Sequence, residues 1–212
     1  MSKRIVIVDY GVGNLYSVRR AVEVCGGKDI CVSDQAKDIL NADKLILPGV
    51  GAFEDGMKGL DERGLIDPIV NAARSGTELL GICLGMQLLA AHSEEFGFHQ
   101  GLSLIPGTVK KIPTLGTQGE ALKIPFIGWA NLRQTTTTSE EKEHIDVLRE
   151  KTVYLVHSYH FVPENQSHIT AIYQYSGVQI TAAIKKENII GVQFHPEKSG
   201  ESGLQIIKAF LN

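Results

Sequence analysis

The chain has 212 residues, 43% of them hydrophobic, which is enough apolar material for a sizeable core. Its 21 basic and 24 acidic residues give a net charge of −3, which argues against nucleic acid or an anionic membrane surface as a partner. Three cysteines without clustered spacing do not form a disulfide framework, and no apolar run reaches the length of a membrane span. We therefore expect one domain over residues 1–212, in the cytoplasm.

The first half of the chain alternates apolar strands with amphipathic helices. The expected strands are Arg4–Asp9, Ile30–Ser33, Lys44–Leu47 and a fourth that starts near Thr77. The expected helices are Leu15–Cys25, a short one from an Asp34 cap to Asn41, Phe53–Leu60 and Leu65–Arg74. This alternation is typical of the α/β class, with a doubly wound, mainly parallel sheet.

The glycines after the first strand resemble a dinucleotide-binding fingerprint. Gly11 and Gly13 have the right spacing, but Tyr16 stands where the third glycine should be. The sequence therefore predicts no cofactor at this turn, and none elsewhere.

The chemistry is expected at Thr77–Gln87, which reads T-E-L-L-G-I-C-L-G-M-Q. A continuous apolar run leads to Cys83, and apolar residues then recur at helical spacing from Leu84 to Ala91. Glycines two residues on either side of Cys83 suit a sharp turn from strand to helix, a nucleophile elbow. The helix N-terminus would favour the thiolate of Cys83, although a short G-x-C-x-G pattern also fits a buried structural cysteine.

The second half of the chain predicts added mixed or antiparallel strands. Long helices are absent from the sequence pattern until Leu204–Leu211. A polar run over 135–143 is expected to be a solvated loop, and 185–188 a hairpin turn. The expected extended stretches are Val109–Ile112, Ala121–Trp129, Val153–His157, Ile169–Tyr175, Val178–Ile184 and Ile189–Phe194.

A base for the thiol is expected near the end of the chain. His195 follows a predicted strand, and Glu197 lies two residues further on. In an extended segment held by Pro196, both side chains would point the same way, so the carboxylate could orient the imidazole. A thiol nucleophile needs such a base, and the base needs a third group to fix its tautomer. We therefore predict a Cys83–His195–Glu197 triad.

These motifs carry a resemblance to a known family. G-I-C-L-G-M-Q together with G-V-Q-F-H-P-E-K-S-G resembles the class I, or triad, glutamine amidotransferases. The opening G-V-G-N-L-Y-S-V, the P-G-V-G at 48–51 and the V-H-S-Y at 156–159 are similar to the glutaminase subunits of imidazole glycerol phosphate synthases. The resemblance covers nearly the whole chain and implies no cofactor and no metal.

The resemblance assigns a role to each matching position. Cys83 would attack the side-chain amide of L-glutamine, His195 would protonate the departing ammonia, and Glu197 would orient His195. An oxyanion hole would take one amide from Val50 or Gly51 and another from Leu84. The residues expected to bind glutamine are Gly49, Gln87, Glu95, His157, Ser158 and Tyr159.

The resemblance also implies a heterodimer with a (β/α)8-barrel cyclase subunit, which would use the ammonia in histidine biosynthesis. Asn14, Tyr16, the Gly49 loop and Trp129 would face that partner. The sequence departs from the family here, because P-H-[IM]-G-W-N is replaced by P-F-I-G-W-A-N at 125–131. Phe126 and Ala130 are the changed positions, so a paralogous role in amidino-sugar synthesis stays open.

Two further classes stay open on the residues alone: another cysteine hydrolase of the same fold, and a non-catalytic binding subunit. Gln87 and the Q-F-H-P-E-K-S run argue against the first, and the intact cysteine, histidine and glutamate against the second. The remaining histidines show no metal-ligand spacing, and we expect them to be surface or packing residues: His92, His99, His144, His160 and His168.

Overall fold

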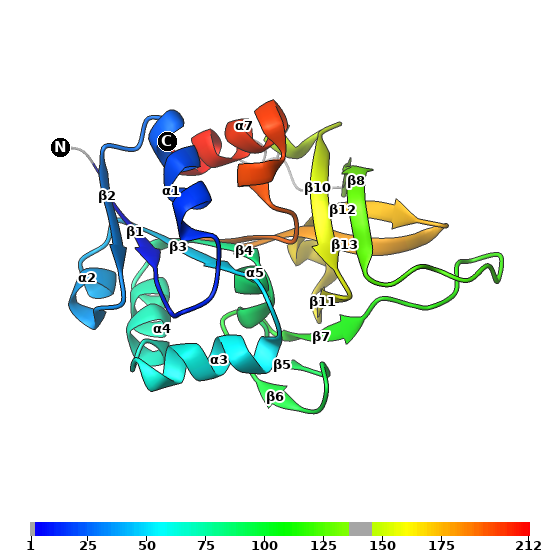
Figure 1. Ribbon diagram of the computed structural model, residues 1–212, viewed down its shortest axis with the longest axis horizontal. Coiled ribbons are helices and arrows are strands. Elements are labelled where there is room, and N and C mark those ends of the chain that lie inside the picture. The colour runs from blue at the N-terminus through cyan, green and yellow to red at the C-terminus, as the bar shows by residue number, and fades with distance from the viewer. Residues whose placement is uncertain (1–2, 136–145) are drawn as a thin grey trace.

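The computed structural model describes residues 3–135 and 146–212, and within them the largest element is a sheet of eight strands (Figure 1). In order across the sheet these are β2 (Asp29–Ser33), β1 (Arg4–Val8), β3 (Lys44–Gly49), β4 (Glu78–Cys83), β14 (Ile189–Val192), β13 (Val178–Lys186), β12 (Ile169–Tyr175) and β9 (Arg133–Gln134). The strands from β2 to β14 pair in parallel, and the pairings from β14 through β13 and β12 to β9 are antiparallel. The predicted α/β fold with added antiparallel strands is confirmed.

Helices cover both faces of the parallel strands (Figure 1). One face carries α1 (Leu15–Val24) and α7 (Gly200–Leu211). The other carries α2 (Ala36–Leu40), α3 (Phe53–Glu62), α4 (Ile66–Arg74) and α5 (Leu84–Leu88). Because both faces are covered, every residue of β3 is buried, and its sequence is apolar almost throughout. Within the described residues, no helix is long and apolar enough to cross a membrane.

Two smaller sheets complete the fold. One pairs β8 (Phe126–Asn131) with β10 (Thr152–His157), and the other has the order β11 (Tyr159–Pro163), β7 (Gly107–Lys111), β5 (His92–Ser93) and β6 (His99–Gln100). Single 3-10 turns occur at η1 (Asp146–Leu148), η2 (Gln166–His168) and η3 (Pro196–Lys198). The predicted stretch from Ala121 forms a strand only from Phe126, and β11 was not predicted.

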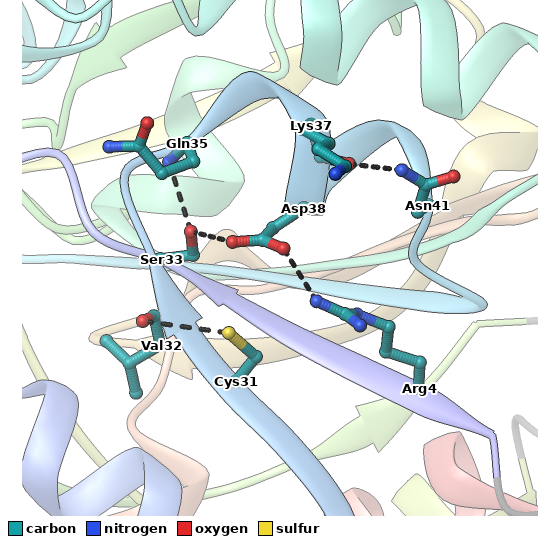
Figure 2. A network of polar contacts seen from close by, with 8 residues as sticks. All are labelled: Arg4, Cys31, Val32, Ser33, Gln35, Lys37, Asp38 and Asn41. Carbon is teal, nitrogen blue, oxygen red and sulfur yellow. Dashed lines mark hydrogen bonds and ion pairs between the residues drawn. The ribbon is translucent and has the colours of Figure 1, made fainter.

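The start of α2 differs from the prediction. Asp34 does not cap it; the helix begins at Ala36 after Gln35, whose side chain makes no capping bond. The segment is held by Asp38 instead (Figure 2). Its carboxylate accepts hydrogen bonds of 2.6 Å from the Ser33 hydroxyl and from the Arg4 guanidinium, which ties α2 to β2 and β1.

The helix after Cys83 is shorter than its apolar spacing predicted. It ends at Leu88 instead of Ala91. Carbonyl groups from Leu88 to Ala91 accept backbone hydrogen bonds from the segment 101–105, so they cannot continue the helix. The predicted polar loop over 135–143 lies outside the described residues, apart from Thr135.

Candidate active site

Cys83 occupies the turn between β4 and α5, and its backbone angles are unusual. Its φ of 54° and ψ of −109° lie in a region that is unfavourable for residues with a side chain. A Cβ atom on Gly85 would lie 1.7 Å from the Leu47 carbonyl oxygen, and one on Gly81 would lie 2.8 Å from that of Gly85. Gly85 is therefore required by the close packing of this turn on β3, and Gly81 by the close packing of β4 against α5. Strain is stored at the thiol-bearing residue.

His195 reaches the same place by strand pairing. β14 is parallel to β4, with Val192 opposite Ile82, so the chain leaves the sheet beside the elbow. The His195 backbone is then fixed by β10, because its N–H donates to the Tyr154 carbonyl at 3.0 Å. Its own carbonyl accepts a 2.7 Å hydrogen bond from the Ser199 hydroxyl. The imidazole is thus supplied by a rigid backbone.

Glu197 contacts the imidazole of His195. Their Oε1 and Nδ1 atoms lie 2.9 Å apart, and the two side chains are 1% and 3% exposed. The expectation of an extended segment was wrong, since Pro196 begins the 3-10 turn η3. Burial alone would lower the pKa of His195, but Cys83 and Glu197 beside it outweigh burial and raise it to about 9. At neutral pH this histidine is therefore an imidazolium beside Cys83.

A cavity of about 280 Å³ lies above these groups. Its wall contains most of the residues predicted to act on substrate, whereas Gly49 and Glu197 lie outside it. Pro125 and Val156 also line it and were not predicted. The lining residues are Val50, Gly51, Cys83, Leu84, Gln87, Glu95, Pro125, Val156, His157, Ser158, Tyr159 and His195.

The Gly49 loop runs beside the elbow. Gly49 pairs with Cys83 in the register of β3 and β4. The hydroxyl of Tyr10 donates to the Pro48 carbonyl at 2.6 Å and fixes the upstream end of the loop. Gly51 has a φ of 104°, and a Cβ atom there would contact nothing within 4 Å. The loop therefore combines one anchored peptide with glycines that can change conformation.

Glu95 fixes the downstream end of the same loop. Its Oε2 atom accepts a 2.7 Å hydrogen bond from the N–H of Phe53, the first residue of α3. Burial raises the pKa of Glu95, while the helix N-terminus favours its ionised form. The sequence predicted Glu95 as a ligand for glutamine. In the structure its carboxylate also caps the N-terminus of α3, where the N-cap residue Ala52 makes no side-chain capping bond.

His157 is held inside the protein by both of its ring nitrogens. A carbonyl can only accept, so Nδ1 donates to the Tyr159 carbonyl at 2.8 Å, and Nε2 then accepts from the Tyr173 hydroxyl at 3.0 Å. Burial lowers the pKa of His157 to about 4. The imidazole is thus neutral and already hydrogen-bonded, which favours a role in shaping the wall that Ser158 and Tyr159 continue.

Gln193 is a residue of the site that the sequence did not single out. It is fully buried, and its Nε2 atom lies 3.7 Å from the Cys83 sulfur. Its Oε1 atom accepts a 3.0 Å hydrogen bond from Gln87. The sequence feature that could have indicated Gln193 is its polar side chain inside the otherwise apolar run from Ile189 to Phe194.

The residues predicted to face a partner subunit lie at the surface or near it. Tyr16 and Trp129 are 78% and 57% exposed, and the Trp129 ring lies edge-on to Tyr154 with centroids 5.9 Å apart. Ile127 shares the exposed face of β8 with Trp129. Asn14 caps α1, since its side chain accepts a 3.2 Å hydrogen bond from the Ser17 amide.

The other histidines that the structure describes are not among the residues that line the cavity. Within residues 3–135 and 146–212, no three or more histidine, cysteine or acidic side chains form a group that could hold a metal ion. His144 lies outside the described residues. Those described are buried or half-buried: His92, His99, His160 and His168.

Comparison with protein families identifies this arrangement. The model for "Glutamine amidotransferase class-I" matches residues 6–212. The chain belongs to this amidotransferase family. The solved structures of a "glutamine amidotransferase" and of "PurLQS from Thermotoga maritima" share its fold, with TM-scores of 0.72 and 0.71 at 16% and 19% identity. The alignments cover 97% of both chains for the first, and 100% of this chain and 99% of that chain for the second.

Curated members of the amidotransferase family are much closer in sequence. "Imidazole glycerol phosphate synthase subunit HisH 1" of Legionella pneumophila strain Paris is 50% identical, over 97% of each chain. The HisH subunit of Geobacter sulfurreducens is 45% identical, over 98% of this chain and 97% of its own. The resemblance read from the motifs is thus confirmed at the level of the family and of its HisH relatives.

Proposed function

We propose that this chain is the glutaminase subunit of an imidazole glycerol phosphate synthase, releasing ammonia from L-glutamine. The observation that carries the proposal is that two segments far apart in the sequence, the turn at Cys83 and the turn with His195 and Glu197, meet at one cavity. The strained Cys83 faces that cavity, His195 lines it as well, and Glu197 holds the imidazole from behind. The full-length similarity to HisH subunits selects the synthase among amidotransferases.

The proposed reaction passes through a thioester. The Cys83 thiolate attacks the side-chain amide carbon of glutamine, and His195 donates its proton to the nitrogen as the C–N bond breaks and ammonia leaves. His195 then takes a proton from water, which attacks the γ-glutamyl thioester and releases glutamate and the thiolate. Amides of Leu84 and of Val50 or Gly51 would hold the oxyanion, at about 3–4 kcal/mol for one donor.

The remaining cavity residues would position the substrate. Glu95 offers a carboxylate to the α-ammonium group of glutamine, and Ser158 and Tyr159 offer further polar groups on the cavity wall. His157 and Gln87 would act mainly by holding that wall, since their side chains are already bonded to the Tyr159 carbonyl. Gly49 would place the oxyanion loop close to Cys83 through its strand register.

The proposed partner is a (β/α)8-barrel cyclase that receives the ammonia. Two observations support a docking face: relatives over the full chain are named as subunits, and Tyr16 and Trp129 are largely exposed. We propose that the chain forms one domain and acts in the cytoplasm. The changed Phe126 and Ala130 keep amidino-sugar synthesis as the alternative acceptor pathway, which an assay with each acceptor would separate.

Replacing the nucleophile tests the proposal directly. In the complex with the cyclase, Cys83→Ala should lower glutamine-dependent turnover by several orders of magnitude and leave ammonia-dependent turnover intact. The matched control is Cys31→Ala, a half-buried free cysteine on β2. We also expect weak glutaminase activity alone and strong stimulation by the liganded partner. Unchanged glutamine turnover in Cys83→Ala would overturn the proposal.

A further inference from the structure

A row of side-chain amides ends on the sulfur of Cys83. The Nε2 group of Gln87 donates to the Tyr159 carbonyl at 2.9 Å and to Oε1 of Gln193 at 3.0 Å. The Nε2 group of Gln193 then donates to the Cys83 sulfur at 3.7 Å. Three parts of the chain, α5, the start of β11 and the segment after β14, thus meet at the nucleophile.

The direction of this row follows from the chemistry of its first member. A backbone carbonyl only accepts, so Gln87 must turn its amino group toward Tyr159. The second N–H of that group points at Gln193, which must therefore present its oxygen. The amino group of Gln193 is then left facing Cys83. The same Tyr159 carbonyl also accepts from His157, so it is fixed from a second side.

Burial makes the arrangement rigid. Gln193 is 0% exposed, so its amide cannot exchange its partners for water, and Gln87 is 5% exposed. The backbone of Gln193 is held by a 2.9 Å hydrogen bond from its N–H to the Ala182 carbonyl. A buried N–H group aimed at a sulfur favours the thiolate over the thiol, because it interacts more strongly with the charged form.

We propose that Gln193 is a positioning residue for the nucleophile: its side-chain N–H holds the Cys83 sulfur as a thiolate, and Gln87 sets the orientation of that N–H. His195 would then supply the proton while Gln193 fixes the sulfur from another side. This inference rests on the proposed function, in which the Cys83 thiolate is the nucleophile that attacks glutamine. It differs from the substrate-binding role expected for Gln87.

The test measures the ionisation of Cys83 in the full chain. Rates of alkylation by iodoacetamide are followed across pH by the mass of the peptide that contains Cys83. In Gln193→Met, which keeps length but removes the donor, the midpoint should rise by about one pKa unit. In Gln193→Glu, which keeps the shape and the acceptor for Gln87, it should rise further. The exposed Gln179→Met on β13 serves as control and should keep the wild-type midpoint.

Kinetics give the second readout. With the cyclase present, kcat for glutamine at neutral pH should fall about tenfold in Gln193→Met, with KM changed less than about twofold. A merely structural role would lower stability or activity but would leave the Cys83 midpoint of the neutral Gln193→Met at its wild-type value, whereas the rise in Gln193→Glu also contains the repulsion of the new carboxylate. Midpoints of both variants within about 0.2 unit of wild type would overturn the inference.

Wild-type protein provides a test that does not depend on folding of the variants. With 15N-labelled glutamine, the side-chain amide signal of Gln193 should shift with the same midpoint as alkylation of Cys83, and a pH-independent signal would overturn the inference. The two proposals fail separately. An active Cys83→Ala enzyme defeats the glutaminase proposal, whereas an inactive one with normal midpoints in the Gln193 variants defeats only this inference.

Discussion

The Nδ1 atom of His195 lies 2.9 Å from the Oε1 atom of Glu197, and water has almost no access to either side chain. The carboxylate therefore fixes the ring orientation, and the Nε2 atom has no hydrogen-bond partner among the described residues. That atom is available to the Cys83 sulfur and to a leaving amine. The pKa of His195, about 9, is the consequence of placing it between Cys83 and Glu197.

Replacing Glu197 by glutamine should lower both the activity and the pKa of His195. Burial lowers the pKa of His195, and the Glu197 carboxylate is one of the groups that raise it again. Without that carboxylate, the NMR titration midpoint of the His195 ring should fall below its wild-type value. We expect kcat for glutamine to fall by about two orders of magnitude or more, because His195, the proposed base, loses its fixed tautomer. Glu201→Gln, an exposed position on α7, is the control. An unchanged ring midpoint in Glu197→Gln would contradict this account.

The same pair contributes to stability with a definite sign. The folded-state pKa of His195 is raised above the ordinary value, so its contribution is fully present below about pH 6.5 and is lost as pH rises toward about 9. In Glu197→Gln, the loss of unfolding free energy between these pH values should be smaller than in wild type. Urea denaturation at a series of pH values measures it.

The central strands of the parallel sheet were predictable because they are buried on both faces and are therefore almost continuously apolar, as in β3. The edge strand β2 is only partly buried. β11 was missed because only Ser158 separates its start at Tyr159 from the end of β10 at His157, and because it carries a histidine and a proline. The length of α5 was overestimated because its apolar spacing continues past Leu88. Its end is set by hydrogen bonds from residues 101–105, which local periodicity cannot reveal.

The site residues that belong to short sequence motifs were predictable. Cys83, His195 and most of the glutamine-binding residues lie at one cavity, although their roles stay predictions. Gln193 contacts the sulfur of Cys83, which lies 110 residues earlier in the chain. Tyr173 on β12 contacts His157 on β10, a strand of another sheet. Such contacts depend on strand order, so a single sequence gives only the faint signal of a polar residue in an apolar run.

Gly85→Ala should be among the most destabilising substitutions in the chain. Its Cβ atom would lie 1.7 Å from the Leu47 carbonyl oxygen, so α5 would have to move away from β3. We expect a loss of about 4 kcal/mol or more in unfolding free energy, or no soluble protein. Gly26→Ala is the control, since its φ is 100° but nothing lies within 4 Å, and it should cost about 1–2 kcal/mol. Equal losses for the two variants would contradict the close-packing argument.

Trp129→Ala should weaken binding to the proposed cyclase subunit. The ring is 57% exposed on β8, so it contributes little to folding and offers a large apolar surface for docking. We expect the Kd measured by isothermal titration calorimetry to rise at least tenfold, or about 1.4 kcal/mol. Leu40→Ala on α2 removes a side chain of similar exposure, 53%, at the far edge of the sheet, and should keep the wild-type Kd. Equal Kd values for all three proteins would place the partner elsewhere.

Acid should destabilise the protein partly through His160, which packs on β11 opposite Lys110. Burial, with a smaller contribution from Lys110, lowers the pKa of His160 to about 4. As pH falls below about 6.5, the unfolded chain takes up the proton first, so stability falls by about 1.4 kcal/mol per pH unit until the folded pKa is reached. In His160→Gln the unfolding free energy should lack this part of its dependence on pH.

The measurement compares unfolding free energies of wild type and His160→Gln from pH 8 to pH 5. The difference at pH 8 gives the packing cost of the substitution, where both side chains are neutral. Between pH 6.5 and pH 5 the variant should gain about 2 kcal/mol relative to wild type. Lys110→Met should reduce the wild-type acid loss slightly, since it removes the neighbouring cation. Parallel profiles for wild type and His160→Gln would show that His160 is protonated equally in the folded and unfolded chain.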